Sequence, residues 1–176
     1  MEKANHPNKV IRFCPRCGSN KFKSTSERSK ECEDCGFHYF FNTSAAVAAL
    51  IFNPEGKIMC VRRAVEPHKG MLDLPGGFVD PMETAEQALA RELKEELGTS
   101  VKEMKYFCSF PNVYPFSGLE VYTLDLAYIV VLDSLSNLVP MDDISAIEFY
   151  YPDKIKMDEF PAESMKNILK KLNERN

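Results

Sequence analysis

The chain has 176 residues, 44% of them hydrophobic and 27% charged, which leaves room for one catalytic domain and one small appendage. Its net charge of −4 argues against attraction of the whole surface to nucleic acid or to an anionic membrane. The sequence has no apolar run of about 18 residues, and its opening MEKANHPNKV is too hydrophilic for a signal peptide. We therefore expect a cytoplasmic protein with no membrane partner.

Residues 1–42 predict a small zinc ribbon. Cys14, Cys17, Cys32 and Cys35 form two Cys-x-x-Cys-Gly knuckles, and the residues between the knuckles can make a short hairpin. Four converging thiolates are typical of tetrahedral Zn²⁺ with no open position, so we expect a structural site; a catalytic or redox role is the weaker alternative. Because so short a segment cannot bury a sufficient core, metal binding would supply much of its folding free energy.

Basic side chains are spread through the same segment and allow a second interpretation, in which the ribbon contacts RNA. Runs of charge are more often solvated surface than binding sites, so we favour the solvated surface and keep RNA as an alternative partner. The basic residues concerned are Lys9, Arg12, Arg16, Lys21, Lys23, Arg28 and Lys30.

Residues 43–176 predict the catalytic domain, which begins with two strands. Residues 44–52 read as a buried strand, and the turn Asn53-Pro-Glu-Gly56 leads into a second strand at residues 57–63. Arg62 and Arg63 end this second strand. They could bind a substrate phosphate or form an ordinary surface pair, and the sequence leaves both interpretations open.

The stretch from Pro75 to Thr99 predicts a glycine loop followed by one amphipathic helix. Thr84 is a good N-cap and forms a capping-box pattern with Gln87, while Gly98 ends the helix at the C′ position. The apolar face consists of Ala85, Leu89, Leu93 and Leu97.

Three glutamates, Glu92, Glu95 and Glu96, are crowded near the end of this helix. At 3.6 residues per turn they fall within an arc of roughly 100°, so their carboxylates can converge on one point. Like charges at this spacing destabilise a helix by a few tenths of a kcal/mol per pair, and the negative end of the helix dipole adds a similar cost. In an arbitrary helix such a cluster would be a solvated face.

Two neighbouring features favour a metal site over a solvated face. Gly76 and Gly77 let backbone carbonyls approach the glutamates, and Glu83 is placed to meet Arg91. Hard oxygen ligands gathered in this way suit Mg²⁺ or Mn²⁺. The predicted ligands are the Gly76 carbonyl, Glu92, Glu95 and Glu96.

The spacing of these residues resembles the signature of the Nudix hydrolases. Gly77 is followed after five residues by Glu83, and after seven more by the run Arg91-Glu-Leu-x-Glu-Glu-x-Gly98. The resemblance implies an α+β fold in which an α/β/α sandwich surrounds a mixed sheet and the signature forms a loop, helix and loop on one side. It also implies metal-dependent hydrolysis, with Glu83 orienting Arg91.

After the helix, residues 101–109 predict a strand, and residues 109–118 predict a loop stiffened by two prolines. Phe110, Tyr114 and Phe116 in this loop could stack against a flat base or flavin ring, or they could fill the core. Both interpretations stay open.

The remaining elements are two strands, at residues 120–132 and 144–151, and a terminal amphipathic helix at residues 161–172. Many Nudix enzymes supply a further carboxylate from the loop between two such strands, and Asp143 fits that position best. The resemblance therefore implies that Glu92 or Asp143 takes the proton from the attacking water. An ordinary acidic turn at Asp143 is the alternative.

The appendage resembles the zinc ribbon that precedes the hydrolase domain in NADH pyrophosphatases, whereas residues 109–125 are more similar to enzymes that split FAD or ADP-ribose. We therefore expect hydrolysis of the pyrophosphate bond in a small nucleotide such as FAD, NADH or ADP-ribose. The alternatives are removal of NAD caps from RNA and a non-catalytic sensor of ADP-ribose. The resemblance also implies a homodimer.

Overall fold

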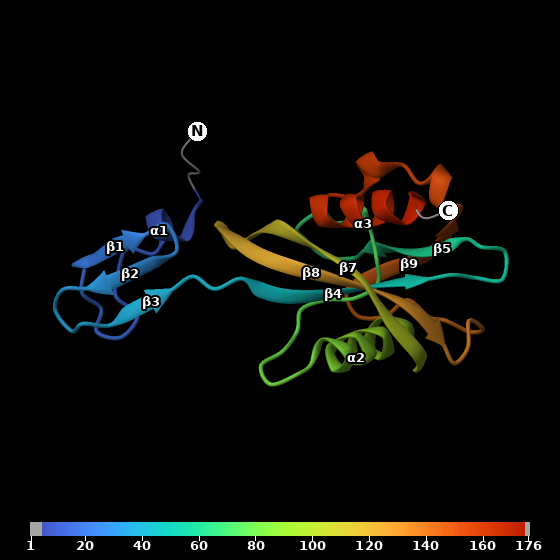
Figure 1. The fold of residues 1–176 in the computed structure, drawn as a ribbon, viewed down its shortest axis with the longest axis horizontal. Helices are drawn as coiled ribbons and strands as arrows, with labels where there is room; N and C mark the ends of the chain where they lie inside the picture. Colours follow the sequence, from blue (N-terminus) through green and yellow to red (C-terminus); the bar gives the residue numbers. More distant parts are fainter. Residues whose placement is uncertain (1–4, 175–176) are drawn as a thin grey trace. The chain divides into compact units, whose positions relative to one another are not determined.

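The computed structural model describes residues 5–174, whose elements are shown in Figure 1. The chain forms two compact units. The first contains the residues up to Thr43 together with Val113–Tyr122, and the second contains Ser44–Asn112 and Thr123–Asn176. Within the described residues, every helix is too short or too polar to cross a membrane.

The first unit is built on a three-stranded antiparallel sheet. It contains the short helix α1 (Pro7–Val10) and the strands β1 (Phe22–Ser26), β2 (Ser29–Cys32) and β3 (His38–Phe40), in the order β1-β2-β3. Its small core consists of Cys14, Phe22 and Cys32, with Ile11, Cys35 and Phe37 packed against them. The hairpin predicted between the two cysteine knuckles is therefore present as β1 and β2.

The second unit contains two three-stranded sheets. One has the order β4-β8-β7, with β4 (Ser44–Ile51) parallel to β8 (Leu119–Leu132) and β7 (Val101–Phe116) at its edge. The other has the order β6-β5-β9 and is antiparallel, with β5 (Ile58–Arg63) between β6 (Leu72–Asp73) and β9 (Ile144–Tyr150).

Two helices cover opposite faces of these strands, α2 (Ala85–Leu97) and α3 (Glu163–Asn173), and Figure 1 shows the strands between them. The alternation of side chains along β4 explains this layering. Val47, Ala49 and Ile51 face the apolar side of α2, whereas Ala48 and Leu50 share a core with α3. Two short 3₁₀ turns, Pro152–Lys154 and Met157–Glu159, lead into α3. The predicted α/β/α sandwich with a mixed sheet is confirmed.

Local sequence signals fix the limits of α2. The Thr84 hydroxyl accepts a hydrogen bond from the Gln87 N–H, and the Gln87 side chain accepts one from the Thr84 N–H. Gly98 ends the helix with a left-handed φ of 69°, which a glycine adopts without steric cost. The capping box and the glycine stop lie where the sequence predicts them.

The prediction of a loop at residues 109–118 is wrong. The strand β7 continues to Phe116, and the chain turns only at Ser117 and Gly118. The prolines misled the prediction. β7 is an edge strand, and Pro111 and Pro115 are four residues apart, so both missing N–H groups fall on the same side of the strand. Proline is tolerated where that side needs no hydrogen bond from the ladder.

Candidate active site

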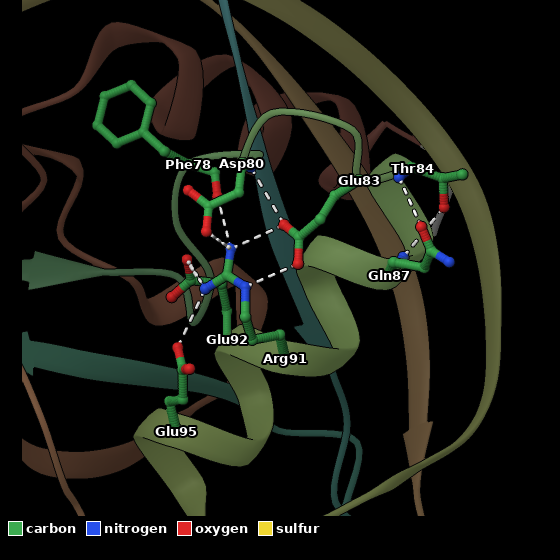
Figure 2. A network of polar contacts seen from close by, with 8 residues as sticks. All are labelled: Phe78, Asp80, Glu83, Thr84, Gln87, Arg91, Glu92 and Glu95. Carbon is green, nitrogen blue, oxygen red and sulfur yellow. Dashed lines mark hydrogen bonds and ion pairs between the residues drawn. The ribbon is translucent and has the colours of Figure 1, made fainter.

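Arg91 on α2 organises a network of carboxylates, which Figure 2 shows at close range. Its Nε and Nη2 donate to the two carboxylate oxygens of Glu83 at 2.9 and 3.0 Å, so the predicted pairing of these residues is present. Its Nη1 donates to Glu92 at 2.8 Å and to Glu95 at 3.0 Å, and its Nη2 also donates to the Phe78 carbonyl at 3.0 Å. The bonds from Arg91 lower the pKa of Glu83.

The two glycines ahead of α2 allow a closer approach than any other residue could. A Cβ on Gly76, whose φ is 140°, would lie 2.1 Å from the Val47 carbonyl oxygen. A Cβ on Gly77 would lie 2.5 Å from the Glu92 carboxyl carbon. A side chain at Gly76 would therefore collide with the β4 backbone, whereas a side chain at Gly77 would displace the Glu92 carboxylate from its present position.

The backbone of this loop alternates between β4 and the helix. The carbonyls of Pro75 and Gly77 accept hydrogen bonds of 2.8 Å from the N–H groups of Ala49 and Val47. The Gly76 N–H donates to the Glu96 carboxylate at 3.0 Å.

Glu96 is the most deeply buried acid of the cluster, with 3% of its surface exposed. Burial raises its pKa to about 9, and repulsion from Asp143 and Glu92 adds to the increase. Burial also raises the pKa of Glu92, although Arg91 opposes the shift. These carboxylates are therefore costly to ionise together in the protein alone, and a divalent cation among them would remove that cost.

Asp143 reaches this cluster because its loop is attached to the end of α2. The Met141 N–H donates to the Glu96 carbonyl at 2.9 Å, and the Ala64 N–H donates to the Asp143 carbonyl at 2.7 Å. The Asp143 carboxylate lies close enough to Glu96 for its negative charge to raise the pKa of the Glu96 carboxyl group. Asp143, Glu92 and Glu96 thus come together from two segments that are about 50 residues apart in sequence.

Glu95 lies differently from the other two helix glutamates. Its side chain is about half exposed and is held by Arg91, on the side of the helix shown in Figure 2. Within residues 5–174 the acidic side chains do not gather three ligand oxygens within 4.8 Å of one another. Glu92 and Glu96 lie beside the Gly76 loop, and Glu95 would have to leave Arg91 to join them at the predicted metal site.

The four ribbon cysteines have the geometry of a closed metal site. Their sulfur atoms all lie within 4.8 Å of one another, with Cys14 to Cys35 at 3.7 Å and Cys17 to Cys32 at 3.6 Å. A tetrahedral zinc with sulfur ligands at about 2.3 Å separates those ligands by about 3.8 Å. The donor set and its spacing fit Zn²⁺.

The two arginines at the end of β5 are already paired with carboxylates. Arg62 bonds Glu148 at 2.5 Å and Glu159 at 3.1 Å, and Arg63 bonds Asp73 at 3.2 Å. This arrangement favours the structural interpretation of the pair over phosphate binding.

The three aromatic residues predicted to bind substrate do not form one group. Phe110 is half-buried against the core of the second unit, with the Lys171 ammonium 5.9 Å from its ring centroid. Tyr114 and Phe116 belong to the first unit and stack on each other, with ring centroids 6.2 Å apart and planes inclined by 18°. Phe110 therefore fits the interpretation as a core residue. For Tyr114 and Phe116, stacking against a base or flavin ring stays a prediction.

Sequence reasoning missed the contacts that complete the site. The hydrogen bond between the Gly76 N–H and Glu96, and the attachment of Met141 to the end of α2, join residues that are far apart in sequence. The adjacent Gly76-Gly77 pair was the available signal for the first contact. Asp73, partly buried beside Arg63, gave no signal of its own.

The layered fold and the glycine loop followed by a carboxylate-bearing helix define a metal-dependent class of nucleotide-processing domains. The sequence profile of the NUDIX domain matches residues 42–172. The chain therefore belongs to the Nudix family.

Relatives and solved structures agree with this assignment. The chain is 32% identical over 123 residues to a protein named NAD-capped RNA hydrolase NudC from Vibrio atlanticus, and 32% identical over 122 residues to the protein of that name from Haemophilus influenzae. These matches cover 69% of this chain but only 45% and 46% of the relatives, so the chain matches about half of their length.

Among solved structures, a Nudix hydrolase from Nitrosomonas europaea is similar in fold, with a TM-score of 0.62, 20% identity and coverage of 92% of this chain and 88% of that one. The Nudix domain of Shewanella oneidensis NrtR, solved with ADP-ribose, has a TM-score of 0.60 and 20% identity over 77% of this chain and 90% of that domain.

The buried carboxyl group predicts a pH effect on the metal-free protein. The pKa of Glu96 is about 9 in the folded state and near 4.5 when unfolded, so the folded state holds the extra proton between these values. Raising the pH through this range therefore destabilises the fold. We expect the melting temperature of the wild-type protein to fall between pH 6 and pH 9 when a chelator is present. The melting temperature of the Glu96→Gln variant should fall less over the same range, because glutamine cannot ionise. Parallel profiles for the two proteins would contradict the burial of an ionisable group.

Proposed function

We propose that this protein hydrolyses the pyrophosphate bond of a nucleoside diphosphate derivative, such as FAD, NADH or ADP-ribose, with the help of Mg²⁺ or Mn²⁺. The observation that carries the proposal is the burial of Glu96 beside Glu92 and Asp143. The Gly76-Gly77 loop packs against these acids, and its residues have no side chains that would fill the space between them. Without a cation this arrangement concentrates negative charge at a place where burial disfavours it.

The proposed ligands are Glu92, Glu95, Glu96 and the Gly76 carbonyl. A divalent cation held there would neutralise charge on the phosphate oxygens and lower the pKa of a bound water. All donors are oxygen atoms, which suits hard cations of this type. Loading must release the proton that Glu96 holds in the metal-free protein, because a carboxylate binds metal only when deprotonated.

The remaining polar residues have supporting roles in this proposal. Glu83 holds Arg91 through two hydrogen bonds. Arg91 in turn donates hydrogen bonds to the Phe78 carbonyl and to the carboxylates of Glu92 and Glu95. Glu92 and Asp143 both face Glu96, and either can accept a proton from the attacking water. Arg91 keeps Glu92 ionised more readily than burial alone would allow, which favours Glu92 as the base.

A second candidate substrate is RNA that carries an NAD cap. The relatives with 32% identity are named for that activity, and the bond broken would be the same pyrophosphate linkage. Two of the basic ribbon residues that could contact RNA already interact with other parts of the protein. Lys30 is buried, and the Lys21 ammonium pairs with the Asp34 carboxylate at 2.8 Å. We therefore rank a small dinucleotide ahead of capped RNA.

A non-catalytic sensor of ADP-ribose is the third candidate. It is suggested by the similarity in fold between this chain and the NrtR domain that was solved with ADP-ribose. A sensor needs the ligand pocket but not the metal carboxylates. This chain keeps the complete glutamate set together with the Gly76-Gly77 loop that accommodates it. We therefore favour the enzyme.

The ribbon cysteines are proposed to hold a structural Zn²⁺, which the sulfur spacing supports. Cytoplasmic location and a homodimer stay predictions of the sequence.

The metal-site proposal predicts a large loss of turnover when a ligand is changed. Glu95→Gln and Glu96→Gln should each lower kcat by about 100-fold or more while the far-ultraviolet circular dichroism is unchanged, because the amide cannot supply the ligand charge. Glu103→Gln, an exposed glutamate on β7, is the matched control and should keep full activity. The assay uses FAD, NADH, ADP-ribose and NAD-capped RNA with Mg²⁺ and with Mn²⁺. Near-normal rates in both ligand variants would refute the proposal.

The zinc proposal has a separate test. Protein purified without added metal and dialysed should contain about one zinc per chain by elemental analysis, because four thiolates give a closed tetrahedral site. The Cys17→Ser/Cys35→Ser variant should contain much less. A chain with intact cysteines and no zinc would remove the ribbon assignment.

A further inference from the structure

An ion pair between the ends of β5 and β6 connects two segments that contact the carboxylate cluster. The Arg63 guanidinium lies 3.2 Å from the Asp73 carboxylate, and the two side chains are only 14% and 20% exposed. Neither residue is among the proposed metal ligands. Each of them, however, is followed directly in the chain by a residue whose backbone N–H donates a hydrogen bond on the way to the site.

On one side, the Asp73 carboxylate bridges Arg63 and the start of the glycine loop. One oxygen accepts a hydrogen bond from the Arg63 Nη1 at 3.2 Å, and the other accepts one from the Leu74 N–H at 2.9 Å. Two residues beyond Leu74, the Gly76 N–H donates to Glu96 at 3.0 Å. Since β6 consists of only two residues, this carboxylate holds the chain where it leaves the strand for the loop.

On the other side, Arg63 fixes the segment that holds Asp143. The next residue is Ala64, whose N–H donates to the Asp143 carbonyl at 2.7 Å. The Arg63 N–H donates to the Met71 carbonyl at 3.1 Å, and its Nε donates to the Pro67 carbonyl at 2.9 Å. These two bonds close the loop that follows β5, so the position of Ala64 depends on the Arg63 side chain.

A second buried acid makes the arginine necessary for Asp73. Burial raises the pKa of Asp73 to about 6, Arg63 opposes the shift, and the negative charge of Asp125 adds to it. Asp125 is 2% exposed and accepts hydrogen bonds from the Thr123 hydroxyl, at 2.6 Å, and from the Ser164 hydroxyl. Removing Arg63 alone would leave Asp73 beside this acid without compensation, so it would lower stability as well as release the loop.

The neighbouring Arg62 offers a comparison within the same strand. Its guanidinium pairs with Glu148 on β9 and with Glu159 in the second 3₁₀ turn, and it also donates to the Gly70 carbonyl at 2.9 Å. Arg62 is therefore tied to carboxylates as Arg63 is, but its carboxylate partners do not begin the glycine loop.

We propose that Arg63 and Asp73 are positioning residues for the metal site, and that their ion pair holds the Gly76 loop and the Asp143 segment against Glu96. This inference rests on the proposed function, because the cation site is itself proposed. Partners that orient a metal site from outside its ligand shell typically change metal affinity by about 10- to 100-fold when they are removed. Because this pair acts through backbone segments, we expect a change near the lower end of that range.

The test measures binding of Mn²⁺ alone to the full-length protein at pH 8, from the electron paramagnetic resonance signal of the free ion. In the double variant Arg63→Met/Asp73→Leu, the Kd for Mn²⁺ should rise about ten-fold. Its melting temperature with chelator should exceed that of Arg63→Met alone, because no unpaired charge remains. Recovered stability with weakened metal binding separates positioning from a merely structural role.

Arg62→Met is the matched control, and it should lower the melting temperature while the Kd for Mn²⁺ stays at the wild-type value. Two results would overturn the inference. Wild-type affinity in the Arg63→Met/Asp73→Leu variant would leave the pair a structural contact only. Equal weakening in Arg62→Met would indicate a general loosening of the fold.

Glu96→Gln separates a failure of this inference from a failure of the proposed function. Weak Mn²⁺ binding in Glu96→Gln, together with wild-type affinity in the double variant, would leave the proposed hydrolase intact and overturn the role of the pair. A wild-type protein that does not bind Mn²⁺ would overturn both.

Turnover gives an independent readout that also tests phosphate binding by Arg63. With the preferred dinucleotide, the double variant should need about ten-fold more Mg²⁺ for half-maximal activity, while KM at saturating Mg²⁺ stays at the wild-type value. A raised KM with an unchanged Mg²⁺ requirement would instead indicate that Arg63 binds the substrate, and would overturn the inference.

Discussion

The catalytic unit depends on one costly arrangement, the burial of the Glu96 carboxyl group near the negative end of a helix. The Gly76 N–H donates a hydrogen bond to this carboxyl group, whereas the charge of the nearby Asp143 opposes its ionisation. The strands, the capped helix and the Met141 attachment all act to bring these groups together. A buried acid is costly to ionise, and this cost favours a role in chemistry over a role in stability.

The same principle connects the two units of the chain. The buried helix carboxylates are unfavourable when ionised together without a cation, and the four ribbon sulfur atoms already have the spacing of a closed metal site. The proposed ions differ in chemistry, because sulfur ligands in a closed site suit zinc and oxygen ligands suit Mg²⁺ or Mn²⁺. In this account one cation orders a structural support and the other drives hydrolysis.

Local patterns in the sequence were sufficient for much of the fold. The capping box at Thr84, the stop at Gly98 and the apolar run that predicts a buried strand at residues 44–52 each depend on neighbours within a few residues, and all three are present. The loop at residues 109–118 failed because proline was taken as a strand breaker, although an edge strand tolerates it.

The candidate site was only partly accessible from sequence. The resemblance to the Nudix signature implied the pairing of Glu83 with Arg91, which is present. The split between a buried Glu96 and a half-exposed Glu95 depends on the contacts with the Gly76 loop and with Arg91. Arg62 found its partner 86 residues away, and that distance explains why its pairing could not be read from neighbouring residues.

Manganese binding seen by anomalous X-ray scattering tests the central claim most directly. In crystals soaked with Mn²⁺, we predict an anomalous peak between Glu92, Glu96 and the Gly76 carbonyl, with Glu95 turned from Arg91 to coordinate the ion. A crystal that binds Mn²⁺ elsewhere, or shows these carboxylates apart and facing solvent at saturating Mn²⁺, would contradict the account.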